Sequence, residues 1–191
     1  LSGADPVLGV EMLSTGEVAC LGENFSDAFS KALRSAEFNI PDRDGTVFIS
    51  VGGSRERKMR VVPIAQAFVE MGFKIYATDH TCDVLNAAGI NAVKLYKVKE
   101  AGATPNVLDF LQERKIDLVI NVPIANRKTS YSDILTDGYI IRRQAVEFNV
   151  PVITNLQLAA ALVDVLKRNS HNGNSIRSLN EYMDELPWKM W

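Results

Sequence analysis

Short apolar runs alternate regularly with helical patterns along most of this sequence. The runs contain few polar residues and lie at residues 46–51, 74–77, 92–96, 117–122 and 150–154. The helical patterns lie at residues 57–71, 82–88, 107–114, 139–148 and 156–168. Strands with little apolar/polar alternation are typical of a parallel sheet that is covered by helices on both faces. We therefore expect an α/β fold, a three-layer, Rossmann-like domain with a five-stranded parallel sheet, over residues 46–168.

A connecting segment, residues 24–45, precedes this domain. Residues 25–38 show the amphipathic pattern of a helix, and Asn24 or Ser26 is suited to cap its N-terminus. The Pro-Asp-Arg-Asp-Gly stretch that follows is typical of a linker.

A tail, residues 169–191, follows the domain. Its first part is polar and rich in Asn, Ser and Gly, which predicts flexibility. Its second part is a short amphipathic segment with apolar residues at helical spacing, namely Leu179, Tyr182, Met183 and Leu186. We expect this stripe to dock on the chain's own domain; a surface for a partner is the alternative.

Charge and composition argue against several kinds of partner. The formal net charge of −2 comes from interspersed acidic and basic residues, so the sequence lacks the basic footprint of a protein that binds nucleic acid or an anionic membrane. No apolar run approaches the roughly 20 residues of a membrane-spanning helix. Cys20 and Cys82 do not form a disulfide-like pattern and fit a reducing compartment. We expect a cytoplasmic protein.

The chain begins with Leu1-Ser2-Gly3, without an initiator Met or a signal-peptide pattern. We expect it to start inside a longer polypeptide. A mitochondrial location therefore stays open.

Polar residues follow every predicted strand, at the point where the strand ends. In an open parallel sheet, ligands bind outside the carboxyl ends of the strands, where helix N-termini point their free N–H groups. Hydroxyls, amides and ammonium groups gathered at one edge would suit a phosphate. The residues at this edge are Ser50, Lys58 beyond a Gly52-Gly53-Ser54 loop, Thr78, Thr81, Lys97, Asn121 and Thr154.

Each of these residues also has an ordinary structural explanation. Thr78 and Thr81 are equally suited to the start of the helix that follows them. Asn121 alone is typical of a turn, and Lys97 alone of a solvated charge. Arg142 and Arg143 are further candidates for the anion site, although salt bridges on a helix surface are the stronger alternative. The prediction of a site depends on the convergence of five strands at one edge.

Several other kinds of chemistry lack their motifs. The Gly52-Gly53-Ser54 loop is not followed by the Lys-Ser/Thr of a P-loop, and no G-x-G-x-x-G opens a helix. His80 and Cys82 supply at most two metal ligands, so we expect no metal site. No Ser/His/Asp set with a nucleophile elbow is visible.

Two stretches resemble one known family. The run D-P-x-L-G-x-E-M-x-S-T-G-E-V within residues 3–23 resembles the end of the second ATP-grasp synthetase half of the carbamoyl phosphate synthetase large subunit. Residues 46–167 resemble the C-terminal regulatory domain of that subunit, which is similar to methylglyoxal synthase. The matching motifs are K-x-R-V-V at 58–62, A-T-x-x-T at 77–81, K-V-x-E at 97–100, I-N at 120–121 and I-R-R-x-A at 141–145.

The resemblance implies regulation within this chain and catalysis elsewhere in the parent protein. Residues 1–23 would end the upstream ATP-grasp domain, and the rest would be a methylglyoxal synthase-like allosteric domain without catalytic residues or cofactor. The parent would be an ATP-dependent ligase, with ATP and Mg²⁺ or Mn²⁺ in its upstream domains. It would form carbamoyl phosphate from bicarbonate and ammonia or glutamine, for arginine and pyrimidine synthesis. Its partners would be the upstream synthetase domains and a glutaminase subunit or domain.

The resemblance also implies a ligand. Relatives hold a nucleotide effector such as UMP, UTP or IMP through its phosphate and ribose. The residues of this sequence at the matching positions are Lys58, Thr78, Thr81, Lys97 and Asn121, with Ser50, Thr154 and Arg143 as additional candidates.

Departures from the family pattern narrow the choice of effector. Relatives that respond to ornithine carry Tyr at the position of Val152, which disfavours ornithine here. Relatives that bind N-acetylglutamate carry Trp at the position of Lys97 and Asn at the position of Ile124, which disfavours that ligand. Pro123 stands where many nucleotide-binding members have a hydroxyl residue, so the effector's identity stays open.

The alternative activity is that of a methylglyoxal synthase-like lyase acting on dihydroxyacetone phosphate. Relatives with that activity supply a carboxylate base from a G-G-D loop after the third strand. This sequence has Lys-Glu-Ala-Gly-Ala at residues 99–103, where Glu100 is the acid within reach.

Overall fold

The sheet has five strands, all parallel. The computed structural model describes residues 18–42, 44–100, 102–124, 136–169 and 176–185. The strands are β1 (Thr46–Val51), β2 (Lys74–Ala77), β3 (Ala92–Lys94), β4 (Leu118–Val122) and β5 (Val152–Ile153). Their order is β3-β2-β1-β4-β5, and every neighbouring pair is parallel. This arrangement confirms the predicted α/β fold with a five-stranded parallel sheet.

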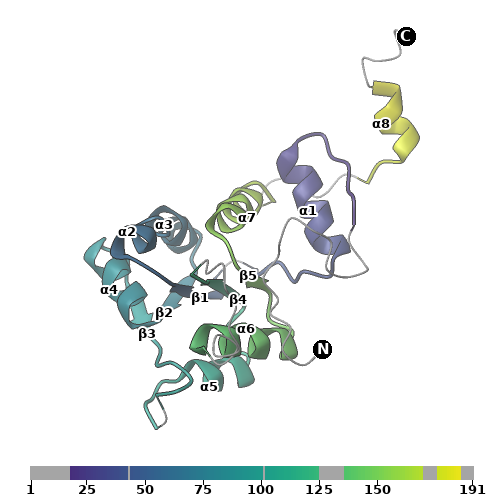
Figure 1. Cartoon of the computed structure of the whole chain (residues 1–191). Helices are drawn as coiled ribbons and strands as arrows, with labels where there is room; N and C mark the ends of the chain where they lie inside the picture. Colours follow the sequence, from purple (N-terminus) through teal and green to yellow (C-terminus); the bar gives the residue numbers. More distant parts are fainter. Residues whose placement is uncertain (1–17, 43, 101, 125–135, 170–175, 186–191) are drawn as a thin grey trace.

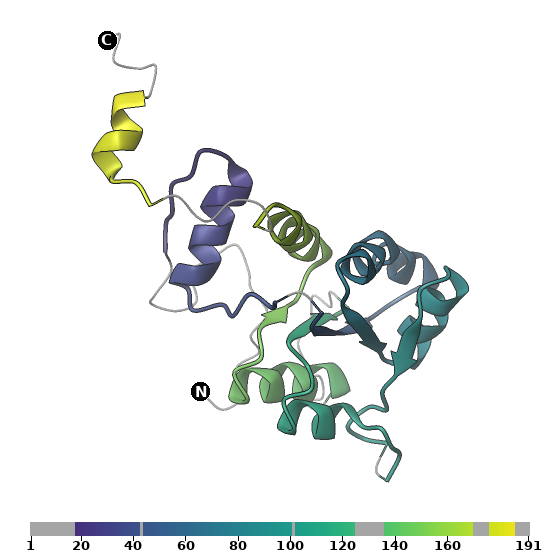
Figure 2. The same cartoon turned by 180° about the vertical axis from the view of Figure 1, so that it is seen from behind.

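Helices cover both faces of the sheet (Figures 1 and 2). α3 and α7 lie over one face, and α5 and α6 lie over the other. The helices are α1 (Phe25–Ser35), α2 (Arg55–Met59), α3 (Val62–Glu70), α4 (Asp79–Ala87), α5 (Val107–Gln112), α6 (Asp137–Glu147), α7 (Leu156–Asn169) and α8 (Leu179–Glu185). The result is the three-layer arrangement expected from the sequence.

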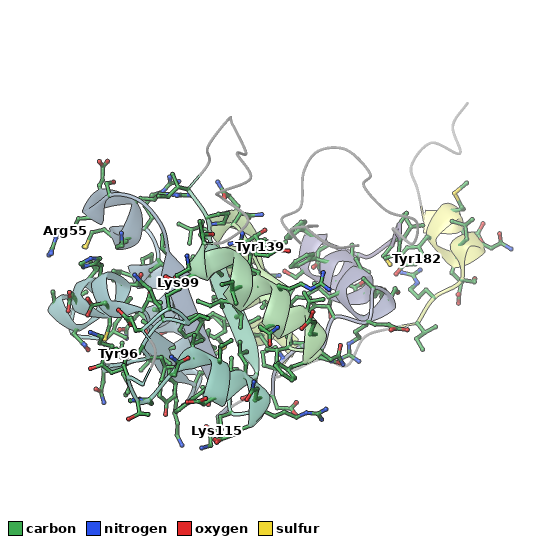
Figure 3. The ribbon with its side chains drawn as sticks, turned by 60° about the horizontal axis from the view of Figure 1, so that its bottom comes forward. Arg55, Tyr96, Lys99, Lys115, Tyr139 and Tyr182 are labelled. Carbon is green, nitrogen blue, oxygen red and sulfur yellow. The ribbon has the colours of Figure 1, made fainter. Side chains whose placement is uncertain are left out.

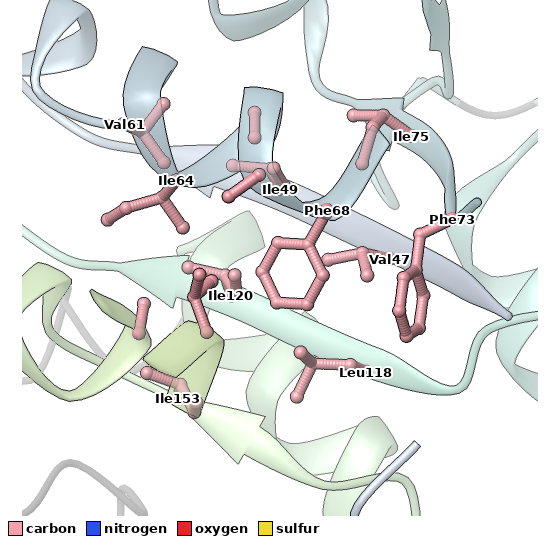
Figure 4. Close-up of a cluster of buried hydrophobic side chains, with 14 of the residues drawn as sticks. Val47, Ile49, Val61, Ile64, Phe68, Phe73, Ile75, Leu118, Ile120 and Ile153 are labelled. Atoms are coloured by element: carbon pink, nitrogen blue, oxygen red, sulfur yellow. The ribbon is translucent and has the colours of Figure 1, made fainter. Parts of the chain in front are cut away.

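The two faces of the sheet bury two separate apolar clusters. Val47 and Ile49 of β1 face α3 and α7, whereas Phe48 between them faces α5 and α6. Figure 4 shows the first cluster, in which Phe68 of α3 lies over β1 and β4. Because successive side chains of a strand point to opposite faces, both faces of these strands must be apolar. The near-continuous apolar runs of the sequence have this origin.

Two predicted helices have different limits in the structure. The pattern at 57–71 forms two helices, α2 and α3, because Pro63 stands in the first turn of α3 and lacks the N–H that a continuous helix would need there. The helix expected over 25–38 ends at Ser35, and Glu37 adopts a positive φ of 56°. Asn24 is its N-cap, because the Asn24 side chain accepts a hydrogen bond from the Asp27 N–H.

The outer strands are shorter than their apolar runs. β3 ends at Lys94, and Tyr96 beyond it makes an isolated parallel bridge with Asn106. β5 contains Val152 and Ile153 and pairs with β4 alone. Strands at a sheet edge have one neighbour to pair with, so local sequence pattern overstates their length.

The strand order fixes where a ligand can approach. The chain moves from β1 to β2 and β3 in one direction, and from β4 to β5 in the other. Connections therefore leave the carboxyl ends of β1 and β4 toward opposite sides, which opens a crevice between them. The predicted polar residues Ser50 and Asn121 stand at these two ends.

α1 and α8 lie beside the sheet domain (Figures 1 and 2). α1 packs against α7, and Leu33 of α1 belongs to the larger apolar cluster. α8 meets α1 through Tyr182, whose hydroxyl accepts a hydrogen bond from the Lys31 ammonium at 2.7 Å. The tail thus contacts its own chain through Tyr182, as predicted, whereas the side chain of Leu179 is 60% exposed. Leu186 lies outside the described residues.

Most of the stretch that resembles an ATP-grasp domain, residues 1–17, lies outside the part of the chain that the structure describes. Within the described part, no helix is both long enough and apolar enough to cross a bilayer.

Candidate functional site

Three strand ends form a continuous polar row, which we call the rim row: Asn121, Ser50 and Thr78. Ser50 and Asn121 are direct partners in the register of β1 and β4. On the other side of Ser50, the Thr78 and Ser50 hydroxyls are hydrogen-bonded at 3.1 Å. The row crosses the carboxyl ends of β4, β1 and β2, as expected from the sequence.

The two threonines of the A-T-x-x-T motif have different roles in the fold. Thr78 occupies the N-cap position of α4, but its side chain makes no capping hydrogen bond. Its carbonyl oxygen accepts from the N–H groups of Thr81 and Cys82, at 2.9 and 2.8 Å. Thr81 is buried, and its hydroxyl oxygen accepts from the Val51 N–H at 3.2 Å. The Thr78 hydroxyl is therefore directed to the rim row, and the Thr81 hydroxyl joins α4 to the end of β1.

Lys58 brings a positive charge to the site from α2. Its side chain is buried, and its ammonium donates to the carbonyl oxygen of Gly53 in the loop after β1. Burial lowers the pKa of Lys58, and the nearby charges of Arg57 and Lys97 lower it further. Three cationic side chains thus approach one another at this edge, an arrangement that a bound anion would stabilise.

Lys97 stands on the loop after β3. Its backbone N–H donates to the Glu100 carboxylate at 2.8 Å, and its carbonyl accepts from the Asn106 side chain at 3.0 Å. These contacts hold the loop and leave the Lys97 side chain half-buried, close enough to Lys58 for the two charges to repel.

In the part of the chain that the structure describes, three carboxylates near the rim row are engaged in structural contacts. Glu100 accepts from the Lys97 N–H, Asp137 accepts from the Lys99 N–H at 3.2 Å, and Asp79 pairs with Lys94 at 2.5 Å. The hydrogen bond from Lys94 lowers the pKa of Asp79 despite a smaller, opposing effect of burial. A general base needs a carboxylate that can reach substrate, so this arrangement suits binding better than proton transfer.

Asn121 carries an unsatisfied donor. The residue is 2% exposed, and its Oδ1 accepts from Nη1 of Arg142 at 2.7 Å. Among the described residues, Nδ2 of Asn121 is the one buried side-chain nitrogen or oxygen atom that has no hydrogen-bond partner. Leaving a buried donor unsatisfied costs about 1–3 kcal/mol, so this amide points to a ligand atom that accepts a hydrogen bond.

The start of α6 approaches this amide closely. A methyl group added at Gly138 would lie 3.3 Å from Nη1 of Arg142 and 3.5 Å from Oδ1 of Asn121. The lack of a side chain at Gly138 therefore lets the first turn of α6 sit beside Asn121. Figure 3 shows the neighbouring residues, with Tyr139 at the start of α6 and Lys99 on the loop near it.

Two additional candidates stand apart from the rim row. Thr154 is buried at the end of β5, one strand beyond Asn121. Arg143 forms an ion pair with Glu147 at 2.7 Å on the surface of α6, which raises the pKa of Arg143. The structure therefore places Arg143 in the surface salt bridge that the sequence analysis gave as its alternative.

The sequence did not indicate a role for Arg57, and for Arg142 it favoured a surface salt bridge over the anion site. Arg57 donates to the carbonyl oxygens of Gly52 at 3.0 Å and Pro123 at 2.7 Å, so it joins the loops that follow β1 and β4. Arg142 is 3% exposed and contacts Asn121. A signal for Arg142 existed, because it lies next to Ile141 and three residues before Ala145 on the apolar stripe of α6.

His80 and Cys82, the chemically reactive side chains of the second strand junction, do not join the site. His80 is exposed and lies 4.0 Å from Asp83. The Cys82 thiol is buried and donates to the Ala92 carbonyl at 3.3 Å. Burial raises the pKa of Cys82, which disfavours the reactive thiolate at neutral pH.

A separate pocket of about 260 Å³ lies at the opposite, amino-terminal edge of the sheet. Its lining residues precede β4 and β5 or belong to the linker before β1, and they include Asn39, Arg114, Asp117 and Asn149. Ligands of open parallel sheets bind at the carboxyl edge, so the rim row is the stronger candidate.

The family of the chain follows from comparison with known proteins. A family model described as an MGS-like domain matches residues 60–154, which span Thr78, Thr81, Lys97 and Asn121. The chain contains an MGS-like domain. The predicted resemblance to the methylglyoxal synthase-like fold is thereby confirmed.

Named relatives match this chain over almost its whole length. It is 39% identical over 189 residues to the carbamoyl phosphate synthase large chain of Methanothrix thermoacetophila, covering 99% of this chain and 17% of that protein. It is 38% identical over 182 residues to the carbamoyl phosphate synthase large chain, C-terminal section, of Aquifex aeolicus, covering 93% and 32%. The multifunctional protein URA2 of Saccharomyces cerevisiae is 37% identical over 174 residues, covering 88% and 8%.

These relatives are much longer than this chain, which spans 32% or less of each of the three. The similarity covers the MGS-like domain together with α1 and the residues before it. The resemblance to the large chain of carbamoyl phosphate synthase, which the sequence motifs indicated, is therefore confirmed.

Proposed function

We propose that this chain is the allosteric regulatory module of a carbamoyl phosphate synthase, and that its rim row binds the phosphate of a nucleotide effector. The observation that carries the proposal is the buried Nδ2 donor of Asn121, adjacent in register to Ser50. The Ser50 and Thr78 hydroxyls and the ammonium groups of Lys58 and Lys97 supply further donors and charge. Among the described residues at this edge, the nearby carboxylates are engaged in structural contacts, so the donors and cations favour an anionic ligand.

The proposed activity belongs to the longer protein. By similarity to its relatives, that protein would form carbamoyl phosphate, with ATP and a divalent metal bound outside this chain. The upstream domains of the same polypeptide and a glutaminase would be its partners. This chain's own residues would bind the effector and pass the signal on.

A physical connection for that signal exists in the fold. α7 begins two residues after Thr154, and the intervening Asn155 caps it by accepting from the Leu158 N–H at 2.7 Å. The same helix packs against α1, which leads back toward the N-terminal part of the chain. An effector acts only through different affinity for two states of the protein, so α7 and α1 are the elements whose position it would bias.

Calorimetric titration of the chain tests the proposal. UMP, UTP, IMP, phosphoribosyl pyrophosphate and N-acetylglutamate should be titrated separately. We expect heat from at least one phosphorylated compound and its loss in Thr78→Ala. Silence with every phosphorylated compound would overturn the nucleotide proposal, and binding of N-acetylglutamate alone would replace it.

A further inference from the structure

Asn121 is held in one orientation by a neighbour on another element. Arg142 of α6 donates to Oδ1 of Asn121 at 2.7 Å, and both side chains are almost fully buried, at 3% and 2% exposed. The two residues lie 21 positions apart in the sequence. The contact joins α6 to β4 at the Asn121 end of the rim row.

The chemistry of this pair allows one orientation of the amide. An arginine side chain has five N–H donors and no acceptor. The atom of Asn121 that faces Arg142 must therefore be the oxygen, and Nδ2 must face away from it. This assignment agrees with Nδ2 having no partner among the described residues.

From this contact we infer that Arg142 is a positioning residue, which fixes the Asn121 amide so that the rim row offers a donor and never an acceptor at this point. The inference rests on the proposed function, since it concerns the same site. It assigns a role to Arg142, which does not touch the ligand in this account. It also sets a requirement on the ligand, namely an oxygen with a free lone pair next to Asn121.

Gly138 belongs to the same arrangement. Its Cα lies where an added methyl group would be 3.3 Å from Arg142 Nη1, closer than most side-chain contacts. A side chain at this position would crowd the guanidinium, which would have to shift by a few tenths of an ångström. The first turn of α6 therefore maintains the geometry of the Arg142–Asn121 pair.

Four variants of the chain test the inference by titration with UMP and with inorganic phosphate. Arg142→Met removes the donor at similar length, Arg142→Lys keeps one donor, and Arg34→Met is the control on an exposed arginine of α1. Because an amide that is free to rotate must be ordered when the ligand binds, we expect Arg142→Met to weaken UMP binding about twofold to tenfold. Arg142→Lys should recover part of the loss, and Arg34→Met should bind as wild type.

The fourth variant, Asn121→Asp, separates orientation from folding. Arg142 would pair with one carboxylate oxygen, so the thermal midpoint should be kept or raised, while the other oxygen would present an acceptor in place of the Nδ2 donor. We expect binding of UMP and phosphate to be lost in a folded protein. Wild-type affinity in Asn121→Asp, or in a folded Arg142→Met, would overturn the inference.

A ligand-free measurement distinguishes this inference from the proposed function. The exchange of the Asn121 Nδ2 protons with water, followed by NMR, should be faster in Arg142→Met than in wild type, because the amide can rotate. If wild type binds none of the phosphorylated compounds, the proposed function fails and this measurement decides the role of Arg142. Unchanged exchange in Arg142→Met would refute that role.

Discussion

Thr78 and Thr81 have different roles at the carboxyl edge of the sheet. The Thr81 hydroxyl accepts from the buried Val51 N–H, whereas the Thr78 hydroxyl contacts Ser50 and caps nothing. The sequence could show that the two threonines stand at a strand end, but it could not divide helix capping from ligand binding. That division depends on the distance between α4 and the end of β1, which is a tertiary property.

Valine substitutions should separate these duties. Thr81→Val leaves the Val51 N–H without an acceptor, which should lower the free energy of unfolding by about 1–3 kcal/mol. Thr78→Val should cost less stability but should weaken effector binding about tenfold to a hundredfold, because a hydrogen bond to a charged group contributes roughly 1.5–3 kcal/mol. Urea unfolding and calorimetry measure the two effects. The reverse pattern would mean that the roles are exchanged.

The lowered pKa of Lys58 predicts that both the stability of the fold and the binding of the effector depend on pH. Burial and the Arg57 and Lys97 charges lower its pKa from the ordinary 10.5, so below that value the unfolded chain binds more protons than the folded one. The contribution of Lys58 to stability should therefore rise as pH rises through this window. A bound phosphate favours the charged ammonium, so effector binding should take up a proton and weaken as pH rises.

Calorimetry in buffers of different ionisation enthalpy measures the proton uptake. A sugar phosphate without a base, such as ribose 5-phosphate, is fully ionised at about pH 9, since the second pKa of a phosphate monoester is about 6, so uptake with this ligand reports the protein. Lys58→Met should abolish it. Equal uptake in wild type and Lys58→Met would show that another group titrates.

At the scale of elements, the sequence predicted the order of strands and helices but missed some of their limits. The continuous apolar runs are local signals, and they predicted the positions of the strands correctly. The break between α2 and α3 and the short β3 depend on packing against neighbours. The role of Arg142 was missed for the same reason, since its partner lies on β4.

The tail is an element whose role can be tested by deletion. α8 contacts α1 through Tyr182 and Lys31, and Arg177 pairs with Glu23 at 3.4 Å. These contacts lie far from the rim row; Figure 3 shows Tyr182 and Arg55, at the start of α2, at opposite ends of the molecule.

Deleting residues 169–191 should leave the effector affinity within about twofold and lower the thermal midpoint slightly, because a single partly buried hydrogen bond contributes about 1 kcal/mol. Tyr182→Phe removes the Lys31 contact and keeps the tail, so it is the matched control. Calorimetry and thermal unfolding provide the comparison. Loss of effector binding in the deletion would assign the tail to the site.

At the scale of the whole molecule, the sheet has two edges with different chemistry. The carboxyl edge gathers the rim row, Lys58 and Lys97, and the amino edge holds the pocket near Arg114 and Asn149. The sequence indicated the first edge because parallel strands bring their carboxyl ends together. The pocket at the amino edge was not predicted, because its lining comes from residues that precede the strands.

Amide NMR of the chain during titration with UMP, with uridine as the matched control, tests the central claim most directly. The account predicts that UMP shifts signals of Ser50, Lys58, Thr78 and the Asn121 side chain, that uridine shifts them far less, and that Arg114 and Asn149 are unaffected. Shifts confined to the amino edge, or equal responses to UMP and uridine, would contradict a phosphate-binding site at the rim row.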